Sequence, residues 1–196
     1  MINIKKIILG ITGASGSIYA KTFIEAIAGT DIHVHIIASN MGKQVIEYEL
    51  STSLENIVEN ISQETTANFA IENSENFFSK VASGSYKTDG MVILPCSMST
   101  IGSVAQGTSH NLLHRAASVC LKEKRKLIIA FRESPLSAVD LSNMLALANN
   151  GATIMPLAPG FYHKPDSLED IINFMVGKIL DNLEIENNLF KRWDGF

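Results

Sequence analysis

The stretch Ile7-Ile8-Leu9-Gly10-Ile11-Thr12-Gly13-Ala14-Ser15-Gly16-Ser17 passes from an apolar strand pattern directly into a turn of small residues. Such a turn lets the backbone approach an anion, and residues 18–28 have a helical pattern whose first amides would face that anion. The spacing Gly10-x-x-Gly13-x-x-Gly16 differs from the Gly-x-Gly-x-x-Gly of dinucleotide sites and lacks the lysine of a Walker loop. Taken alone, the turn fits a phosphate cradle and an ordinary strand-to-helix connection equally well.

Short apolar runs rich in β-branched residues recur along the chain, with helical patterns between them. This alternation predicts an α/β fold of three layers, doubly wound around a mainly parallel sheet. The predicted strands are Lys6–Ile11, His33–Ala38, Met91–Pro95, Leu127–Phe131 and Thr153–Met155. Helices are predicted over 111–125 and 167–183, and Ser167 with Asp170 forms a near capping box at the start of the second. Residues 41–82 are expected to contain a helix and an excursion of the chain, and not a linker.

The composition excludes several classes of protein. A length of 196 residues suits one well-buried core, so a single domain over residues 1–196 is expected. With 46% hydrophobic and 18% charged residues, surplus apolar surface is expected to bury against copies of the chain. A net charge of −4 argues against nucleic-acid binding. The two cysteines suit a reducing compartment, and without a signal-type or membrane-spanning stretch a cytoplasmic protein is expected.

Polar groups follow most of the predicted strands. Ligands of open parallel sheets bind outside the carboxyl ends of the strands, so these segments are where a site is expected. They are Gly13-Ala14-Ser15, Ser39-Asn40, Pro95 to Thr100, Arg132-Glu133-Ser134-Pro135 and Pro156 to Pro159. Helix capping explains any single Ser or Thr equally well, but the concentration of polar groups at one edge favours a ligand site.

Two pairs of charged residues suggest anion binding and proton transfer. Arg132 and Glu133 leave a buried strand together and can serve an anionic ligand and a proton, although a salt bridge at the sheet edge is the alternative. Arg115 and Lys122 are two helical turns apart, so they share a face and can converge on one phosphate. A solvated helix face is the alternative for this second pair.

The histidines and cysteines give weaker signals. His110 and His114 have the i, i+4 spacing of a zinc pair but no evident third ligand, so no metal site is predicted. His33 and His35 share one face of a strand and are expected to be interior or interface residues. Cys96 is expected to be a small buried residue and not a nucleophile, because no neighbouring cation would lower the pKa of its thiol.

Six motifs in sequence order, covering nearly the whole chain, resemble the flavin prenyltransferases of the UbiX type. They are Gly10-Ile-Thr-Gly-Ala-Ser-Gly16, Met91-Val-Ile-Leu-Pro-Cys-Ser-Met-Ser-Thr100, Arg115-Ala-Ala117 with Leu121-Lys-Glu123, Arg132-Glu133-Ser-Pro135, Gly160-Phe-Tyr-His163 and Arg192-Trp193. The resemblance implies a Rossmann-like flavoprotein that joins a dimethylallyl group from dimethylallyl monophosphate to N5 and C6 of reduced FMN without a metal. It also implies a large, dodecamer-like homo-oligomer with sites at subunit contacts, and prenylated FMN made for a partner UbiD-type decarboxylase.

The resemblance assigns roles to individual residues. The residues implied to contact FMN are Gly13, Ala14, Ser15, Ser39, Ser97, Met98, Ser99, Thr100 and Arg132. Those implied to meet the prenyl phosphate are Ser15, Arg115, Lys122, Tyr162 and Lys178. Glu133 is implied to handle the proton, with Ser15 as the second catalytic residue. The chain departs from the family where Ser118 replaces the usual Asp and Lys178 a common Arg, which keeps the charge but loses the bidentate fork.

Two other functions remain as alternatives. An FMN-dependent decarboxylase of the cysteinyl or phosphopantothenoylcysteine type would show a Pro-x-Met-Asn motif, which the sequence lacks. A flavin-binding module without turnover would keep the flavin turns and lose Glu133, Arg115 or Lys122, all of which are present.

Overall fold

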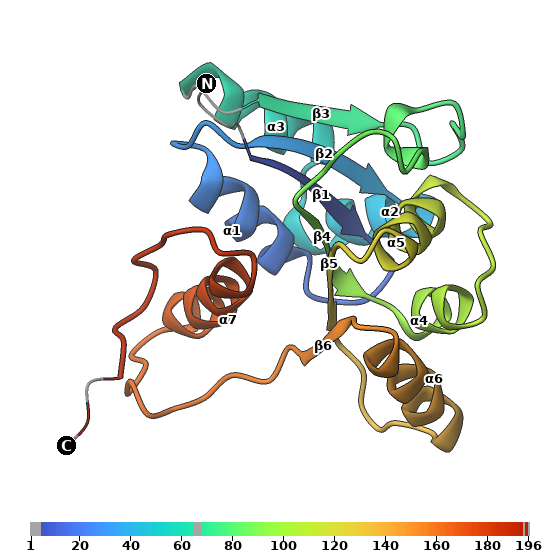
Figure 1. Cartoon of the computed structure of the whole chain (residues 1–196). Coiled ribbons are helices and arrows are strands. Elements are labelled where there is room, and N and C mark those ends of the chain that lie inside the picture. The colour runs from blue at the N-terminus through green and yellow to red at the C-terminus, as the bar shows by residue number, and fades with distance from the viewer. Residues whose placement is uncertain (1–4, 65–67, 194, 196) are drawn as a thin grey trace.

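Six parallel strands form one sheet in the order β3-β2-β1-β4-β5-β6 (Figure 1). The computed structural model describes residues 5–64, 68–193 and 195. The strands are β1 Lys6–Ile11, β2 His33–Ala38, β3 Asn68–Glu72, β4 Gly90–Cys96, β5 Lys126–Phe131 and β6 Thr153–Pro156. Successive strands are added on one side of β1 as far as β3, and from β4 onward on its other side, as in doubly wound nucleotide-binding folds. The predicted fold class is confirmed.

Helices cover both faces of the sheet. Their bounds are α1 Ser17–Ile27, α2 Asn40–Leu50, α3 Leu54–Glu64, α4 Met98–Ala105, α5 Leu112–Lys122, α6 Ala138–Asn149 and α7 Leu168–Asn182, with a short 3₁₀ turn, η1, at Lys80–Ala82. Side chains alternate across a strand, so Ile7 and Leu9 pack with α1, α2, α3 and α7, whereas Ile8 packs with α4, α5 and α6. The central strand β4 is buried along its whole length, which explains its unbroken apolar run.

The structure corrects the interpretation of residues 41–82 in one respect. This region was expected to hold a helix and an excursion, and it contains two helices, α2 and α3, followed by strand β3 at the edge of the sheet. Strand β3 has only five residues, Asn68-Phe69-Ala70-Ile71-Glu72, and none of them is fully buried. An edge strand with so little apolar content has no clear periodicity in the sequence. No helix within the described ranges is long and apolar enough to cross a bilayer.

The predicted interior position of His35 is confirmed. Its ring is fully buried between β2 and the segment that follows β3. Nδ1 donates to Glu72 Oε1 over 2.7 Å, and Nε2 accepts from the Tyr86 hydroxyl over 2.9 Å. Both ring nitrogens are thus satisfied by the neutral imidazole. Glu72 is held in turn by the Ser79 hydroxyl at 2.7 Å, so the network ties the edge strand to the loop before β4.

Stability is expected to fall as the pH drops below about 6.5. Burial lowers the pKa of His35 from its ordinary value of 6.5, and the hydrogen bond that His35 donates to Glu72 opposes this only in part. The unfolded chain therefore binds the proton more readily, and the contribution of His35 to stability is complete above pH 6.5 and lost below it. Thermal unfolding at pH 7.5 and 5.5 measures the effect. His35→Gln should reduce this pH slope, and an equal slope in both proteins would contradict the assignment.

Candidate functional site at the junction of β1 and β4

A buried threonine joins the carboxyl ends of β1 and β4, where the strand order reverses. Thr12 Oγ1 donates to the carbonyl of Pro95 over 2.8 Å and accepts from the amide of Ser97 over 2.8 Å. The amide of Thr12 donates to the same carbonyl. The side chain of Thr12 is only 2% exposed, so these bonds are shielded from water. The crevice in which doubly wound folds bind their ligands therefore has a rigid floor.

A cavity of about 360 Å³ opens above this junction. It is lined by Thr12, Gly13, Ser39, Asn40, Met41, Ser74, Glu75, Ser97, Ser99, Thr100, Asn111 and His114. Three of these residues cap different helices: Ser39 accepts from Gly42 N at the start of α2, Ser97 from Thr100 N at α4, and Asn111 from His114 N at α5. Three helix N-termini thus point at one cavity, and their partial positive charges favour an anion such as a phosphate.

The amides in the first turn of α1 already bind an anion, the carboxylate of Glu49. Gly16 has a φ of 114°, a conformation that favours glycine, and its amide together with that of Ser17 donates to Glu49 Oε2 over 3.0 and 2.7 Å. Burial acts to raise the pKa of Glu49, but hydrogen bonds from Ser15, Ser17 and Gly16 outweigh it and leave the pKa below its ordinary value. Sequence reasoning missed Glu49, because no motif marks its position.

The residues predicted to contact FMN are mostly brought together. Gly13, Ser39, Ser97, Ser99 and Thr100 line the cavity. Around it, Ala14 is buried, Met98 packs against the core, and Ser15 is exposed beside Glu49.

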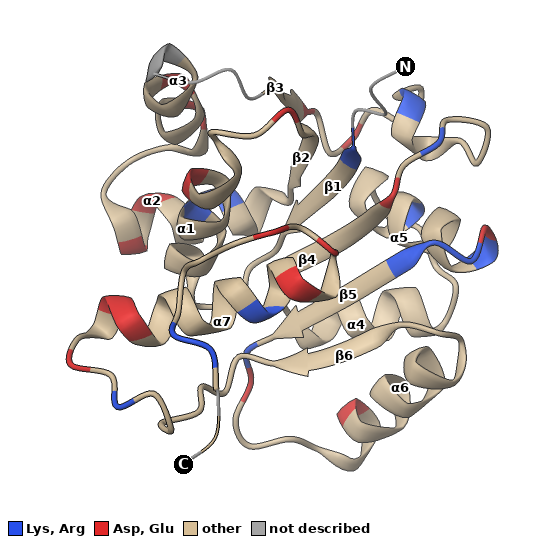
Figure 2. Ribbon diagram, turned by 60° about the vertical axis from the view of Figure 1, so that its left-hand side comes forward, with Lys and Arg blue, Asp and Glu red and all other residues tan. Residues whose placement is uncertain are grey.

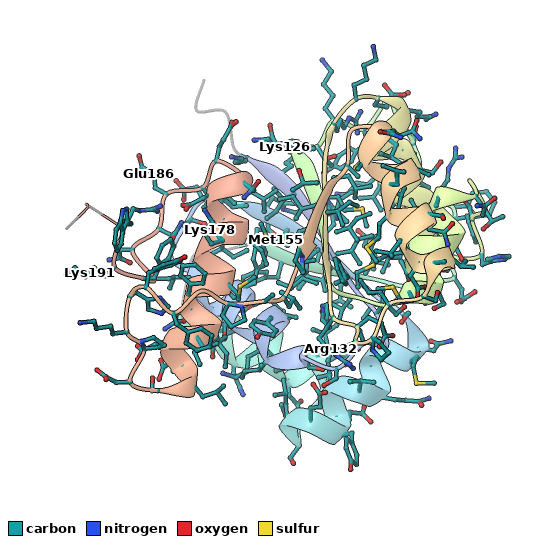
Figure 3. The ribbon with its side chains drawn as sticks, turned by 90° about the horizontal axis from the view of Figure 1, so that it is seen from below. Lys126, Arg132, Met155, Lys178, Glu186 and Lys191 are labelled. Carbon is teal, nitrogen blue, oxygen red and sulfur yellow. The ribbon has the colours of Figure 1, made fainter. Side chains whose placement is uncertain are left out.

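Arg132 and Glu133 lie at the carboxyl end of β5, whereas Lys126 marks the opposite end of this strand (Figure 3). Both side chains are exposed and lie outside the lining of the 360 Å³ cavity. Arg132 Nη1 is 4.0 Å from Glu133 Oε1, which also accepts from the amide of Ser134. An ion pair at that distance between exposed groups is weak, so both groups are available to a ligand.

Arg115 and Lys122 line a second cavity of about 420 Å³ together with residues 82–85 and Glu123. Arg115 Nε donates to the carbonyl of Ala82 over 3.0 Å, which fixes the guanidinium. Lys122 Nζ lies 3.8 Å from Glu123 Oε1. The two cations predicted to share a helix face therefore do meet at one polar cavity.

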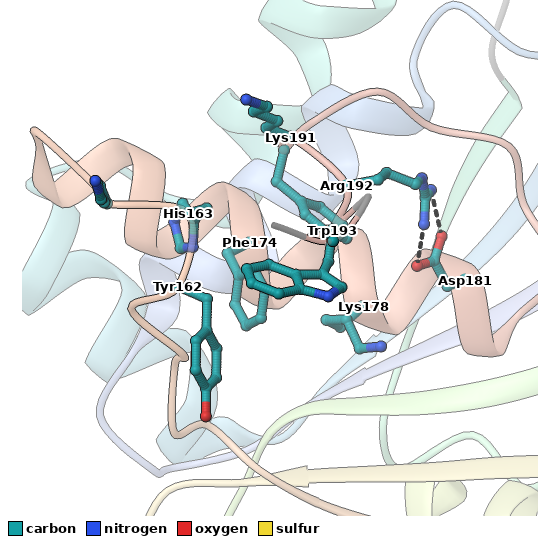
Figure 4. A pocket seen from close by; sticks show the side chains of 11 residues that line it. Tyr162, His163, Phe174, Lys178, Asp181, Lys191, Arg192 and Trp193 are labelled. Atoms are coloured by element: carbon teal, nitrogen blue, oxygen red, sulfur yellow. Dashed lines mark hydrogen bonds and ion pairs between the residues drawn. The ribbon is translucent and has the colours of Figure 1, made fainter.

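Tyr162 and Lys178 line a third cavity, of about 580 Å³, between α7 and the C-terminal segment (Figure 4). Arg192 holds this segment against α7 through two bonds of 2.7 Å to the carboxylate of Asp181. The ring of Trp193 thereby lies 5.9 Å from that of Tyr162. Asp181 has no motif around it in the sequence, so its role was not predicted.

One chain does not assemble the residues predicted to meet the prenyl phosphate. Arg115 and Lys122 come from α5, Lys178 comes from α7, and these helices pack on opposite faces of the sheet. Ser15 lies in the turn after β1, at the junction.

His110 and His114 lie beside each other at the start of α5, and the two cysteines are buried. The rings of His110 and His114 are 6.1 Å apart, and the described residues include no group of three His, Cys, Asp or Glu that could hold a metal. Cys96 is fully buried, as predicted, and burial raises the pKa of its thiol. Cys120 is buried as well, and burial raises the pKa of its thiol to about 12.

Comparison with known proteins identifies the family. A family model described as Flavoprotein matches residues 1–180. The flavin prenyltransferase UbiX of Methanocaldococcus jannaschii is 48% identical over 188 residues, which cover 96% of this chain and 98% of that protein. The chain belongs to the flavin prenyltransferases of the UbiX type. The UbiX of Aquifex aeolicus is 40% identical over 193 residues, covering 97% of this chain and 100% of that protein.

Solved structures agree with this assignment. A crystal structure of a UbiX protein in complex with FMN and dimethylallyl pyrophosphate has a TM-score of 0.92 and 34% identity, covering 99% of this chain and 100% of the other. A dodecameric FMN-dependent UbiX-like decarboxylase from Escherichia coli O157:H7 has a TM-score of 0.88 and 35% identity, covering 97% and 100%. The peptidyl-cysteine decarboxylase EpiD is 17% identical with a TM-score of 0.62, which shows a shared fold alone.

Gly42 is expected to be essential for the position of Ser39 in this UbiX-type site. A Cβ atom on Gly42 would lie 2.7 Å from the carbonyl oxygen of Ile11, so the helix must move away from β1. Gly42→Ala should cost about 1–3 kcal/mol of unfolding free energy and weaken FMN binding. Gly102→Ala in α4 is the matched control, because its nearest neighbour, the Asn143 side chain, lies at 3.5 Å. Denaturant unfolding and FMN titration measure both effects, and equal behaviour of the two variants would contradict the prediction.

Proposed function

We propose that this protein transfers a dimethylallyl group from dimethylallyl monophosphate to N5 and C6 of reduced FMN. The observation that carries the proposal is the cavity at the junction of β1 and β4, in a chain of the UbiX type. Its hydroxyl groups and three helix N-termini suit the phosphate of a mononucleotide. Reduced FMN is both ligand and substrate here, because its ring supplies the nucleophilic positions that are alkylated.

We propose Arg115, Lys122 and Lys178 as the groups that stabilise the leaving phosphate. Breaking an allylic C–O bond leaves charge on the phosphate, and fixed cations lower the barrier most where that charge develops. The backbone contact of Arg115 holds its guanidinium in place before the substrate arrives. Lys178 supplies a charge without the bidentate geometry of Arg. These side chains can supply the positive charge that the reaction needs without a metal.

We propose Glu133 as the base that takes up the proton released at C6, and Ser15 as a hydrogen-bonding partner of the reacting groups. Glu133 is exposed at the carboxyl end of β5, and its carboxylate is held by the amide of Ser134. Arg132 beside it adds a positive charge at the same strand end. A carboxylate placed in this way can accept a proton while Arg132 contacts the flavin.

We propose that each complete site lies between copies of this chain in a large, dodecamer-like homo-oligomer. The placement of α5 and α7 on opposite faces of the sheet supports this, because their cations cannot converge within one chain. Helix α6 exposes Val139, Leu141 and Leu145, at 68%, 54% and 62%, and carries only one charged residue (Figure 2). Such an apolar face is typical of a surface that packs against another subunit. The product would serve a UbiD-type decarboxylase.

The activity is tested by mass spectrometry of the flavin. Purified protein, reduced FMN and dimethylallyl monophosphate are mixed anaerobically, and the flavin should gain one C5 prenyl unit. Glu133→Gln should slow this gain by about 10²-fold or more and leave FMN binding unchanged. No gain of a prenyl unit by the unaltered protein would refute the proposed function. Loss of FMN binding in the Glu133→Gln protein would refute only the role given to Glu133.

The shared site is tested by mixing inactive subunits. Lys122→Ala and Lys178→Ala should each be nearly inactive, but co-expressed mixtures should regain activity. Random assembly gives about a quarter of sites with both lysines. The control mixture of Lys122→Ala with Arg115→Ala should stay inactive, because every site then lacks one α5 cation. Absence of recovery in the first mixture, with mixed oligomers shown by native mass spectrometry, would place the site within a single chain.

A further inference from the structure

The ring of His114 lies in the wall of the cavity at the junction of β1 and β4. It is the third residue of α5 and only 8% exposed, and its Nδ1 atom is buried without a hydrogen-bond partner. Other polar groups of the same wall do have partners: the Thr12 hydroxyl bonds to Pro95 and Ser97, and the Asn111 side chain accepts from the amide of His114. A buried polar group left without a partner in a ligand cavity calls for an explanation.

The surroundings of His114 favour its neutral form. Burial lowers the pKa of the ring, and the neighbouring His110 lowers it further. Glu75 is the one carboxylate among the residues that line the cavity, and its Oε1 accepts from the Ser74 hydroxyl over 3.3 Å. Arg115 is turned away toward the carbonyl of Ala82. The start of α5 also disfavours a positive charge on the ring.

A neutral imidazole carries one donor and one acceptor, so the unpartnered Nδ1 decides the tautomer. A buried N–H without a partner is rarer in proteins than a buried acceptor without one. We therefore assign the proton to Nε2, which leaves Nδ1 as the unsatisfied acceptor. Nε2–H then becomes the group that a bound molecule can reach, and it requires an acceptor.

We propose that Nε2–H of His114 donates a hydrogen bond to the phosphate of FMN, so that His114 is a further flavin-binding residue. This inference rests on the proposed function, since it assumes that the cavity takes FMN. The phosphate is the part of the flavin that matches the surroundings, because three helix N-termini converge on the cavity that His114 lines. A phosphate oxygen would satisfy a donor that the chain itself leaves free.

The test separates the two ring nitrogens and the two parts of the ligand. His114→Leu removes both nitrogens, His114→Gln places an amide donor near the position of Nε2, and His114→Asn places one near Nδ1. Loss of one hydrogen bond to a charged group should weaken FMN binding about tenfold. We expect this loss in the Leu and Asn variants, near-normal affinity in the Gln variant, and unchanged riboflavin affinity in all three.

His110→Leu is the matched control, because His110 lies one turn away and does not line the cavity. It should bind FMN as the unaltered protein does. Affinities are measured by quenching of flavin fluorescence, after circular dichroism has shown that each variant is folded. If His114→Leu fails to fold, the comparison of Gln with Asn carries the test.

Two results would overturn the inference: equal FMN affinity in the Gln and Asn variants, or an equal loss of affinity for FMN and riboflavin. Failure of the proposed function gives a different pattern. In that case the unaltered protein itself neither binds FMN nor prenylates it. A protein that prenylates FMN normally, with FMN affinity insensitive to residue 114, would refute the role of His114 alone.

Discussion

The hydroxyl of Thr12 is the contact on which the site depends. It joins the carbonyl of Pro95 to the amide of Ser97. The ends of β1 and β4 are thereby fixed to each other at the point where the order of strands in the sheet reverses. The turn after β1 and the cap of α4 both start from this point. Because the bonds are buried, losing the hydroxyl would leave the Ser97 amide unpaired and the Pro95 carbonyl with only the Thr12 amide as a donor, which would loosen two walls of the cavity together.

Sequence reasoning succeeded where a physical rule acts locally. The buried strands are recognisable in the sequence as apolar runs, and the predicted capping box of α7 is formed between Ser167 and Asp170. It failed where a residue's interaction partner lies outside its own motif or element, or where a strand has no clear apolar periodicity. Glu49 binds backbone amides more than 30 residues away, Asp181 bonds directly to Arg192 of the C-terminal segment, and β3 is an edge strand with little apolar pattern. Only the folded chain brings such groups together.

The cationic groups proposed to bind the prenyl phosphate are divided between the two faces of the sheet. Arg115 and Lys122 lie on the side of α5, whereas Lys178 and Tyr162 lie with α7 and the C-terminal segment. Each half is held by its own contact, the Ala82 carbonyl for Arg115 and the Asp181 carboxylate for Arg192. Under the proposed assembly, each subunit carries two preformed partial sites, and the geometry of catalysis depends on assembly as well as on folding.

The carboxylate of Glu49 has a consequence for which nucleotides the fold admits. In dinucleotide enzymes of this architecture, the pyrophosphate rests on the amides at the start of the first helix. Here those amides, Gly16 and Ser17, already bond to Glu49. A pyrophosphate approaching this turn would lose both donors and meet a like charge. We therefore expect Glu49 to disfavour nicotinamide dinucleotides at this turn, while the neighbouring cavity, which Glu49 does not line, stays open to a ligand with a single terminal phosphate.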